Sequence, residues 1–393
     1  MMMFLLQLLL AIALIGLSLL LAYLWFLALS YLFQKKQHTE LAAQPSSRFV
    51  FVVPAHNEEL GITATVQSLL SVQYPRSLFD VVVVADNCSD ATAEQARAAG
   101  AVCLERHDIN LRGKGYALRY AFTELIPKGY DCFIVIDADS VVSPNFLLVL
   151  DARLCRGERV IQAYDGLSNP DASILTYLFQ VGNLIENKLF WQPKESYNLP
   201  IMLRGNGMCF ASDILEAHPW SAFSIVEDTE YGLLLIKNGV KIHFAADIGV
   251  YATQPETFQQ AFAQRVRWAS GNASLTKGRA LGLIKSGIIN RNAALIDFGI
   301  SLIVGSRPLL LLTNMLLIIG TVVAGSLRLQ VWAVALLLTQ LGYIGCGVLI
   351  NGVTVRKMGR LFASPFYLAW LTTVSVLGLA GFRKNQWTRT ARQ

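Results

Sequence analysis

Long uncharged stretches lie at the two ends of the chain, and a mixed polar and apolar segment lies between them. Residues Met1–Gln34 contain no Asp, Glu, Lys or Arg. Three further uncharged stretches follow near the other end, at Pro308–Leu327, Leu329–Val355 and Leu361–Phe382. Each is long enough to cross a bilayer as a helix, so the pattern predicts a membrane protein.

The first stretch is expected to be a retained transmembrane helix. A secretory signal would have a basic start and a short apolar core, and this stretch has neither. Lys35 and Lys36 follow at once, which places this end in the cytoplasm by the positive-inside rule. The last stretch contains Pro365, and a full crossing would put the basic tail 383–393 outside. We therefore expect Leu361–Phe382 to lie in the interface or to re-enter.

The middle of the chain alternates between two periodicities. Helical spacing is seen in GITATVQSLLSV, ATAEQARAAG and GKGYALRYAFTEL, and strands are expected in RFVFVVPA, FDVVVVAD, AVCLERH and DCFIVID. Strands that alternate with helices predict a parallel sheet with right-handed crossovers. The Val-rich runs are typical of strands that are covered on both faces.

Polar residues follow three of the expected strands. They are His56, Asn57, Glu58 and Glu59 after the first strand, Asp86, Asn87 and Asp90 after the second, and Asp137 and Asp139 after the fourth. Because the carboxyl ends of parallel strands share one edge, this edge is the expected ligand site. Asp137 and Asp139 fit either a plain turn or the oxygen ligands of a divalent cation.

The second half of the segment adds polar groups whose interpretation stays open. Glu227 and Asp228 precede an expected helix and could serve as a cap or as reactive carboxylates. Gln264, Arg267 and Trp268 fit one polar face of an interfacial helix. In RGNGM, Gly205 and Gly207 fit a tight turn.

Composition narrows the class of protein. The chain has 393 residues, of which 54% are hydrophobic, a mean hydropathy of +0.45 and a net charge of +6. Much of the basic excess flanks the apolar stretches, which suits an anionic membrane surface and not a nucleic acid.

Six cysteines without CxxC spacing indicate a reducing compartment and no zinc site. A dinucleotide fold is disfavoured, because no GxGxxG follows the first strand.

Six short segments, taken in order, resemble the motifs of membrane-bound family 2 glycosyltransferases. This group contains cellulose, hyaluronan and poly-N-acetylglucosamine synthases and lipid glucosyltransferases. The segments, spread over about residues 50–270, are PAHNEE, ADNCSDAT, GKGYAL, DADS, VEDTEYG and QRVRW. The resemblance implies an α/β GT-A fold flanked by transmembrane helices, with a mostly parallel sheet. It also implies a nucleotide-sugar donor, expected to be a UDP-sugar, a Mg²⁺ or Mn²⁺ cofactor and inversion at the anomeric carbon.

The resemblance also implies roles for individual residues. On the donor side, Asp86 would hold the nucleobase, Pro54, Ala55 and Glu58 the nucleoside rim, and Lys114 and Asp137 the donor pocket. Asp139, with Asp137 beside it, would bind the metal. Asp228 would be the catalytic base, with Glu227 as the first alternative. Asn206 and Gly207 would line the sugar or acceptor pocket, and Gln264, Arg267 and Trp268 would hold the diphosphate and acceptor.

These inferences predict an enzyme with four parts. They are an N-terminal transmembrane helix (1–34), a cytoplasmic GT-A domain (47–291), a membrane region with about three hydrophobic segments (292–382) and a basic tail (383–393). We expect a hexosyl- or N-acetylhexosaminyltransferase in the plasma or inner membrane that elongates an exopolysaccharide, with a partner subunit that could complete an export pore. The alternatives are the transfer of one sugar to a lipid and, more remotely, a non-catalytic membrane binder or transporter.

Overall fold

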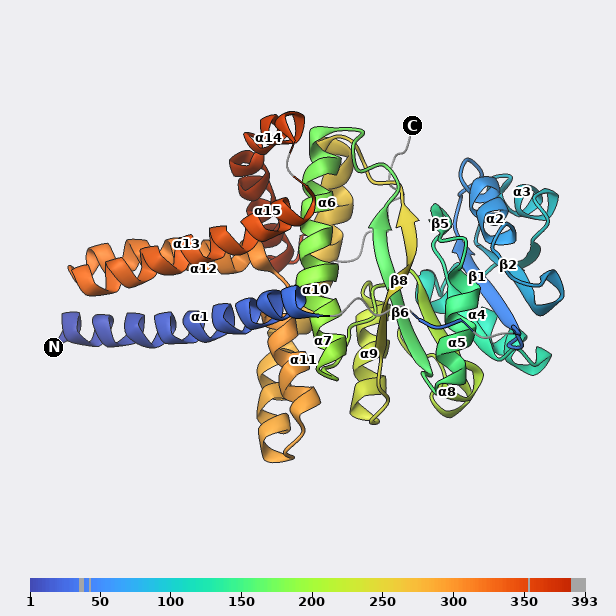
Figure 1. The fold of residues 1–393 in the computed structure, drawn as a ribbon, viewed down its shortest axis with the longest axis horizontal. Helices are drawn as coiled ribbons and strands as arrows, with labels where there is room; N and C mark the ends of the chain where they lie inside the picture. Colours follow the sequence, from blue (N-terminus) through green and yellow to red (C-terminus); the bar gives the residue numbers. More distant parts are fainter. Residues whose placement is uncertain (35–38, 42–43, 353, 383–393) are drawn as a thin grey trace. The chain divides into compact units, whose positions relative to one another are not determined.

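The computed structural model describes residues 1–34, 39–41, 44–352 and 354–382. The chain divides into two units, whose helices and strands are labelled in Figure 1. A sheet unit comprises Lys35–Asn169 and Asn198–Gln254, and a helical unit comprises Met1–Gln34, Pro170–Tyr197 and Pro255–Gln393. Lys35, Lys36 and the tail 383–393, which carried the predicted orientation, lie outside the described residues.

This division differs from the predicted catalytic segment 47–291. Residues 170–197 and 255–291 belong to the helical unit, so the segment is shared between the two units. The bounds of the functional domains stay a prediction.

The sheet unit is built on eight strands in the order β3-β2-β1-β4-β7-β6-β8-β5. Their bounds are β1 Phe49–Ala55, β2 Phe79–Asp86, β3 Val102–Arg106, β4 Cys132–Val135, β5 Ser140–Val142, β6 Val160–Leu167, β7 Met208–Ala211 and β8 His243–Ala252. The four strands β1 to β4 are mutually parallel, and β6 is parallel to β8. Strand β7 runs antiparallel to β4 and β6, and β5 runs antiparallel to β8.

Helices cover both faces of this sheet, as the Val-rich strands require. On one face Phe49, Phe51 and Val53 of β1 pack in one buried cluster with Ile62 of α2 and Phe146 of α5. Strand residues point alternately to the two faces. The opposite face packs on α4, where the rings of Phe122 and Phe133 lie 5.8 Å apart.

The remaining elements of the sheet unit are short. The helices are α2 Ile62–Leu70, α3 Thr92–Ala98, α4 Lys114–Leu125, α5 Phe146–Cys155, α8 Ser212–Ala217 and α9 Glu227–Lys237, and the 3₁₀ turns are η1 Arg76–Leu78 and η2 Ile126–Lys128. The prediction of an α/β fold with a mostly parallel sheet is confirmed. Each of the four expected strands and three expected helices coincides with an element of the structure.

The helical unit contains the apolar stretches. Its elements are α1 Met2–Phe33, α6 Ile174–Glu186, the π-helical turn η3 Asn187–Trp191, α7 Gln192–Ser196, α10 Phe258–Ile289, α11 Ala293–Val304, α12 Arg307–Val323, α13 Leu327–Ile350, α14 Val355–Leu361 and α15 Ser364–Leu379. Among the described residues, α1 and α13 are long and apolar enough to cross a membrane. Helices α11 and α12, bent by 71° at their junction, could together form a third crossing.

Helix α15 is too short to cross a bilayer as a straight helix. It has 16 residues, fewer than the roughly 20 that a crossing helix needs. The interfacial or re-entrant placement of this segment stays a prediction.

Helix α1 is joined to helices far along the chain. The Gln7 side chain donates to the Ala324 carbonyl at 2.9 Å, and the Trp25 indole donates to the Thr339 carbonyl at 3.2 Å. These bonds connect α1 to the end of α12 and to α13. Polar groups in an apolar helix need such partners, because lipid offers none.

A buried ion pair joins three more elements of this unit. Lys194 of α7 is fully buried, and its Nζ lies 2.7 Å from Asp297 Oδ2 and donates to Ser301 Oγ at 2.7 Å. Tyr23 of α1 donates to the other Asp297 oxygen at 2.6 Å. Removal of one partner would leave a buried charge uncompensated, so the cluster fixes α1, α7 and α11 to each other.

Helices α10 and α15 approach closely at Gly378. A Cβ added to Gly378 would lie 2.6 Å from both the carbonyl carbon and the Cβ of Ala269. Such a distance is possible only without a side chain, so Gly378 sets the spacing of the two helices.

We therefore expect Gly378→Leu to force α10 and α15 apart and to lower the unfolding temperature of the detergent-solubilised protein by several degrees. Gly282→Leu is the matched control, because Gly282 is a helical glycine of α10 with no atom within 4 Å of its added Cβ. The control should unfold at or slightly above the wild-type temperature, since leucine favours the helix by up to about 1 kcal/mol. Equal unfolding temperatures for the two variants would contradict the assigned contact.

Candidate active site

The loops after β1 and β2 interlock at the carboxyl edge of the sheet. The register places Ala55 opposite Ala85, so the two strands end side by side. His56 Nδ1 lies 2.7 Å from the Asp86 carbonyl oxygen, and the Glu58 backbone N–H donates to Thr92 Oγ1 at 2.8 Å. The predicted donor-side residues of these two loops therefore lie together.

Asp86 is held by a cation that the sequence analysis missed. Its carboxylate is 3% exposed and accepts from Arg106 Nη1 at 2.6 Å and from Asn87 Nδ2 at 3.0 Å. Arg106 is the last residue of β3, so it also lies at the carboxyl edge of the parallel sheet. The rule that ligand-side residues follow parallel strands could have found it.

Lys114 connects the DADS turn with the RGNGM segment. Its Nζ donates to Asp137 Oδ1 and, at 2.6 Å, to the Gly205 carbonyl. A Cβ added to Gly205 would lie 3.2 Å from Asp228 Oδ2 and 3.6 Å from Lys114 Nζ. The cation is therefore surrounded by groups from three segments that are far apart in the sequence.

Burial and charge act in opposite directions on Lys114. Burial alone would lower the pKa of its ammonium group, but the nearby carboxylates of Asp137 and Glu227 outweigh it and raise that pKa. The charged form of Lys114 is therefore favoured within the acidic cluster.

Glu227 and Asp228 open helix α9, as the sequence analysis expected. Burial, followed by the neighbouring Asp228 carboxylate, raises the pKa of Glu227 to about 8 against the lowering effect of Lys114. Burial also raises the pKa of Asp228, whose Oδ1 accepts from the Thr229 backbone N–H at 2.7 Å. Two carboxyl groups thus compete for one lysine in a partly buried site.

Asn206 forms hydrogen bonds to the DADS turn. Its Oδ1 accepts from the Asp137 backbone N–H at 3.1 Å, and its Nδ2 donates to Ser140 Oγ at 2.9 Å. The Ser140 hydroxyl in turn donates to Asp139 Oδ1 at 3.1 Å. Asn206 is buried, with 4% of its surface exposed. It holds the Asp137 backbone directly and the Asp139 carboxylate through the Ser140 hydroxyl.

A glycine is needed at position 207, because the neighbouring strands leave no room for a side chain there. Its φ is +69°, and an added Cβ would lie 2.8 Å from Val250 Cγ2 and 3.1 Å from Ala163 Cβ. The tight-turn interpretation of RGNGM fits this geometry. Its predicted role toward the acceptor stays a prediction.

An aromatic stack connects the Lys114 helix with the loop before Glu227. The rings of Tyr116 and Phe223 lie 4.5 Å apart and are tilted by only 14°. Arg106 lies over the Tyr116 ring and Arg119 over the Phe223 ring, at 5.9 Å and 4.9 Å from the ring centres. The stack therefore leads from the partner of Asp86 to the loop that carries Glu227, and neither ring was singled out in the sequence.

The remaining predicted residues, Gln264, Arg267 and Trp268, lie on α10 in the helical unit. Gln264 and Arg267 are partly exposed, and the Trp268 side chain is 37% exposed. Helix α10 runs on to Ile289, so these residues lie within its first three turns.

The carboxylates of the sheet unit fit a hard divalent cation. Their oxygens are the ligands that Mg²⁺ and Mn²⁺ prefer, and the mutual repulsion of Glu227 and Asp228 shows a surplus of negative charge. Among the described residues there is no group of three or more His, Cys, Asp or Glu side chains with the arrangement of a metal site. Asp137 and Asp139 alone would therefore supply only part of a coordination shell.

Comparison with known sequences gives a family match over most of the sheet unit. The profile of the family described as "Glycosyltransferase like family 2" matches residues 45–271. A probable glycosyltransferase of Sulfolobus acidocaldarius is 27% identical over 248 residues, which are 60% of this chain and 52% of that protein. A beta-monoglucosyldiacylglycerol synthase of Trichormus variabilis is 28% identical over 261 residues, 62% of this chain and 53% of that protein. The chain thus spans about half the length of these curated relatives.

A solved structure resembles this chain over almost its whole length. The mannosyltransferase of Pyrobaculum calidifontis, solved in complex with GDP-Man and Mn²⁺, aligns with a TM-score of 0.60 at 19% identity. The alignment covers 96% of this chain and 99% of that one. The likeness supports the GT-A fold.

The raised pKa of Glu227 predicts a pH-dependent stability. The folded state holds this proton up to a pH of about 8, whereas an unfolded glutamate loses it near its ordinary value of 4.5. Between these values the unfolded state has already lost the proton, so the stability falls as pH rises. Glu227→Gln should remove this fall and be more stable than wild type at pH 8 by at least about 1 kcal/mol.

The measurement is thermal unfolding of wild type and variant at pH 5 and pH 8. The difference should be small at pH 5 and larger at pH 8. Glu216→Gln, which replaces an exposed glutamate of α8, is the control and should follow wild type at both values. A Glu227→Gln variant less stable than wild type at pH 8 would contradict the desolvated carboxyl.

Proposed function

Because the chain belongs to the glycosyltransferase-like family 2, we propose that it transfers a hexosyl or N-acetylhexosaminyl group from a nucleotide sugar to an acceptor hydroxyl with inversion. The observation that carries this proposal is the position of Lys114. Its ammonium group binds Asp137 of the DADS turn and the carbonyl of Gly205, whose Cα adjoins Asp228. The groups needed for the leaving diphosphate and for the attacking hydroxyl are thus within one cluster.

On the donor side, the interlocked loops would bind the nucleoside. Asp86 would accept hydrogen bonds from the nucleobase through the oxygen that Arg106 does not occupy, and Pro54, Ala55 and Glu58 would form the rim. A buried, oriented carboxylate suits the N–H groups of a uracil or guanine edge. The proposed donor is therefore a UDP- or GDP-sugar, with UDP as the prediction from sequence.

Asp137 and Asp139 would hold Mg²⁺ or Mn²⁺ together with the diphosphate. The ion, when bound, neutralises the charge that develops on the departing diphosphate. Asn206 and Ser140 keep the two aspartates in place for it. Lys114 supplies a further positive charge that does not depend on the ion.

Asp228 is the proposed general base. It must be ionised when the acceptor hydroxyl attacks, and its backbone hydrogen bond from Thr229 and its place in the first turn of α9 favour the charged form. Glu227, whose pKa is raised to about 8, would remain mostly protonated near pH 7. The repulsion that would otherwise suppress ionisation of Asp228 is thereby reduced.

We propose a lipid as the acceptor, at the cytoplasmic face of a multi-pass membrane protein. The candidate crossings α1 and α13 support a location in the membrane. The relative from Trichormus variabilis, named as a beta-monoglucosyldiacylglycerol synthase, supports a lipid acceptor. The QxxRW residues of α10 would hold the acceptor and the diphosphate. A growing exopolysaccharide is the second candidate, supported by the likeness of the motif set to the polymer synthases, and it would need the partner subunit for export.

The test uses the purified full chain with radiolabelled UDP- and GDP-sugars, Mg²⁺ or Mn²⁺ and either a diacylglycerol or a monoglycosyl lipid. A labelled product of lipid size supports lipid transfer, and a labelled polymer supports the second candidate. If neither product forms with any donor, although the donors bind, the proposed transfer is wrong.

The metal ligands give a sharp prediction. Asp139→Ala should abolish transfer without a change in unfolding temperature, because this turn lies at the edge of the core. EDTA should inactivate wild type, and added Mn²⁺ or Mg²⁺ should restore wild type but not the variant. Asp131→Ala, at an aspartate just before β4, is the control and should keep the response to metal. Full activity of wild type in metal-free buffer would rule out the proposed ion.

The base gives a second prediction. Asp228→Asn should bind the donor with nearly unchanged affinity but transfer sugar on the order of 10²–10⁴-fold more slowly, since an amide cannot accept the proton. Donor affinity by calorimetry and turnover by product formation separate the two effects. More than half of the wild-type turnover in this variant would make Glu227 the candidate base.

A further inference from the structure

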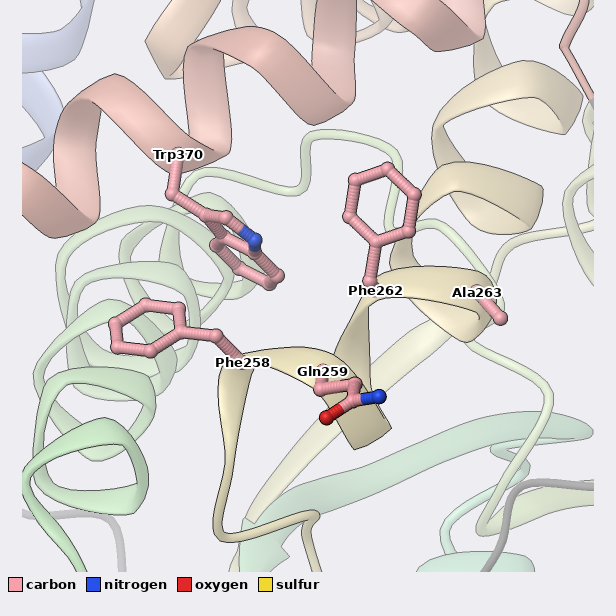
Figure 2. A pocket seen from close by; sticks show the side chains of 5 residues that line it. All are labelled: Phe258, Gln259, Phe262, Ala263 and Trp370. Atoms are coloured by element: carbon pink, nitrogen blue, oxygen red, sulfur yellow. The ribbon is translucent and has the colours of Figure 1, made fainter.

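A cavity lies between α10 and α15, within the helical unit. It measures about 410 Å³ and is lined by Phe258, Gln259, Phe262, Ala263 and Trp370. Figure 2 shows the rings of Phe258, Phe262 and Trp370 arranged around a common space. Its volume falls in the range of small-molecule sites, and its lining is almost wholly apolar.

The spacing between α10 and α15 differs along their length, and this difference creates the cavity. At Gly378 and Ala269 their backbones touch, because no side chain separates them. At the other end the Phe258 ring lies 5.2 Å from Trp370 and 5.0 Å from Phe366, so bulky rings hold the helices apart. The cavity therefore results from a contrast between glycine at one end of the helix pair and aromatic residues at the other.

A positive charge adjoins the aromatic wall. The Arg265 guanidinium lies 4.0 Å from the centre of the Phe179 ring, and that ring contacts Tyr367 and Trp370 at 6.0 Å and 6.5 Å. The surrounding sequence has the same sign of charge. Between Phe258 and Phe382 there are eleven Lys and Arg residues and a single acidic residue, Asp297.

We propose that this cavity binds an acyl chain of an anionic glycerophospholipid, with the phosphate of the headgroup beside Arg265. The apolar rings match the chain, and the excess of cations over this segment complements the charge of the headgroup. Phe366, 62% exposed on the same helix, extends the apolar surface beyond the cavity. The bound lipid is a fixed component of the helical unit and not the sugar acceptor, so the inference does not rest on the proposed transfer.

The test measures quenching of Trp370 by brominated lipids in vesicles that contain the full chain. The chain has seven tryptophans, so the Trp370 signal is taken as the difference between wild type and Trp370→Phe. Brominated phosphatidylglycerol, at a few mole per cent in phosphatidylcholine, should quench this signal at least about threefold more than brominated phosphatidylcholine at the same level. Equal quenching by the two lipids would show only contact with the bulk bilayer and would overturn the proposal.

Two variants separate the cavity from general membrane contact. Ala263→Phe fills the cavity and should abolish the preference for phosphatidylglycerol. Arg265→Gln should reduce it severalfold, whereas Arg279→Gln, an exposed arginine further along α10, should leave it unchanged. If Ala263→Phe does not fold, the two arginine variants still decide. Equal effects of Arg265→Gln and Arg279→Gln would overturn the proposed site.

Discussion

Repulsion between carboxylates at one edge of a sheet is the constraint around which the sheet unit is organised. Asp137, Glu227 and Asp228 act on a single lysine, so the carboxyl groups outnumber the cation that they face. The backbone contacts of the region oppose the repulsion. Asn206 clamps the DADS turn, Gly205 lets the chain pass within reach of Asp228, and the Tyr116–Phe223 stack holds the loop before α9 against α4. The fold thus keeps together charges that would separate in water, as is common at functional sites.

The parallel half of this fold could be read from the sequence, because its signals are local. Four runs with the composition of strands, three of them followed by polar residues, identify β1 to β4 and the edge where their ends meet. The antiparallel half could not be read in this way. Strand β7 has only four residues, Met208–Ala211, and lies between β4 and β6, which come much earlier in the chain. Its place depends on pairing over long sequence distances, which no local pattern encodes.

The same limit applies to the candidate site. Asp137, Asp139, Glu227 and Asp228 are recognisable, since carboxylates are unusual beside buried segments. Arg106 and the Tyr116–Phe223 stack were missed, because an arginine at a strand end and two separate aromatic residues are unremarkable until the fold brings them together. Asn206 was expected to line the sugar or acceptor pocket, but its hydrogen bonds to the DADS turn are a property of tertiary structure alone.

The partners of α1 have a consequence for the order of biosynthesis. Gln7 and Trp25 bond to groups 317 and 314 residues further along the chain. At roughly 5–20 residues per second, a ribosome needs roughly 15–60 s to add that many residues. During this interval the partners of Gln7 and Trp25 are not yet made, while all the strands of the sheet unit are made and can pair. The contacts of α1 with α12 and α13 can therefore form only after the strands of the sheet unit are complete, and a chain stalled before α12 would have a finished sheet but an α1 without these two hydrogen bonds.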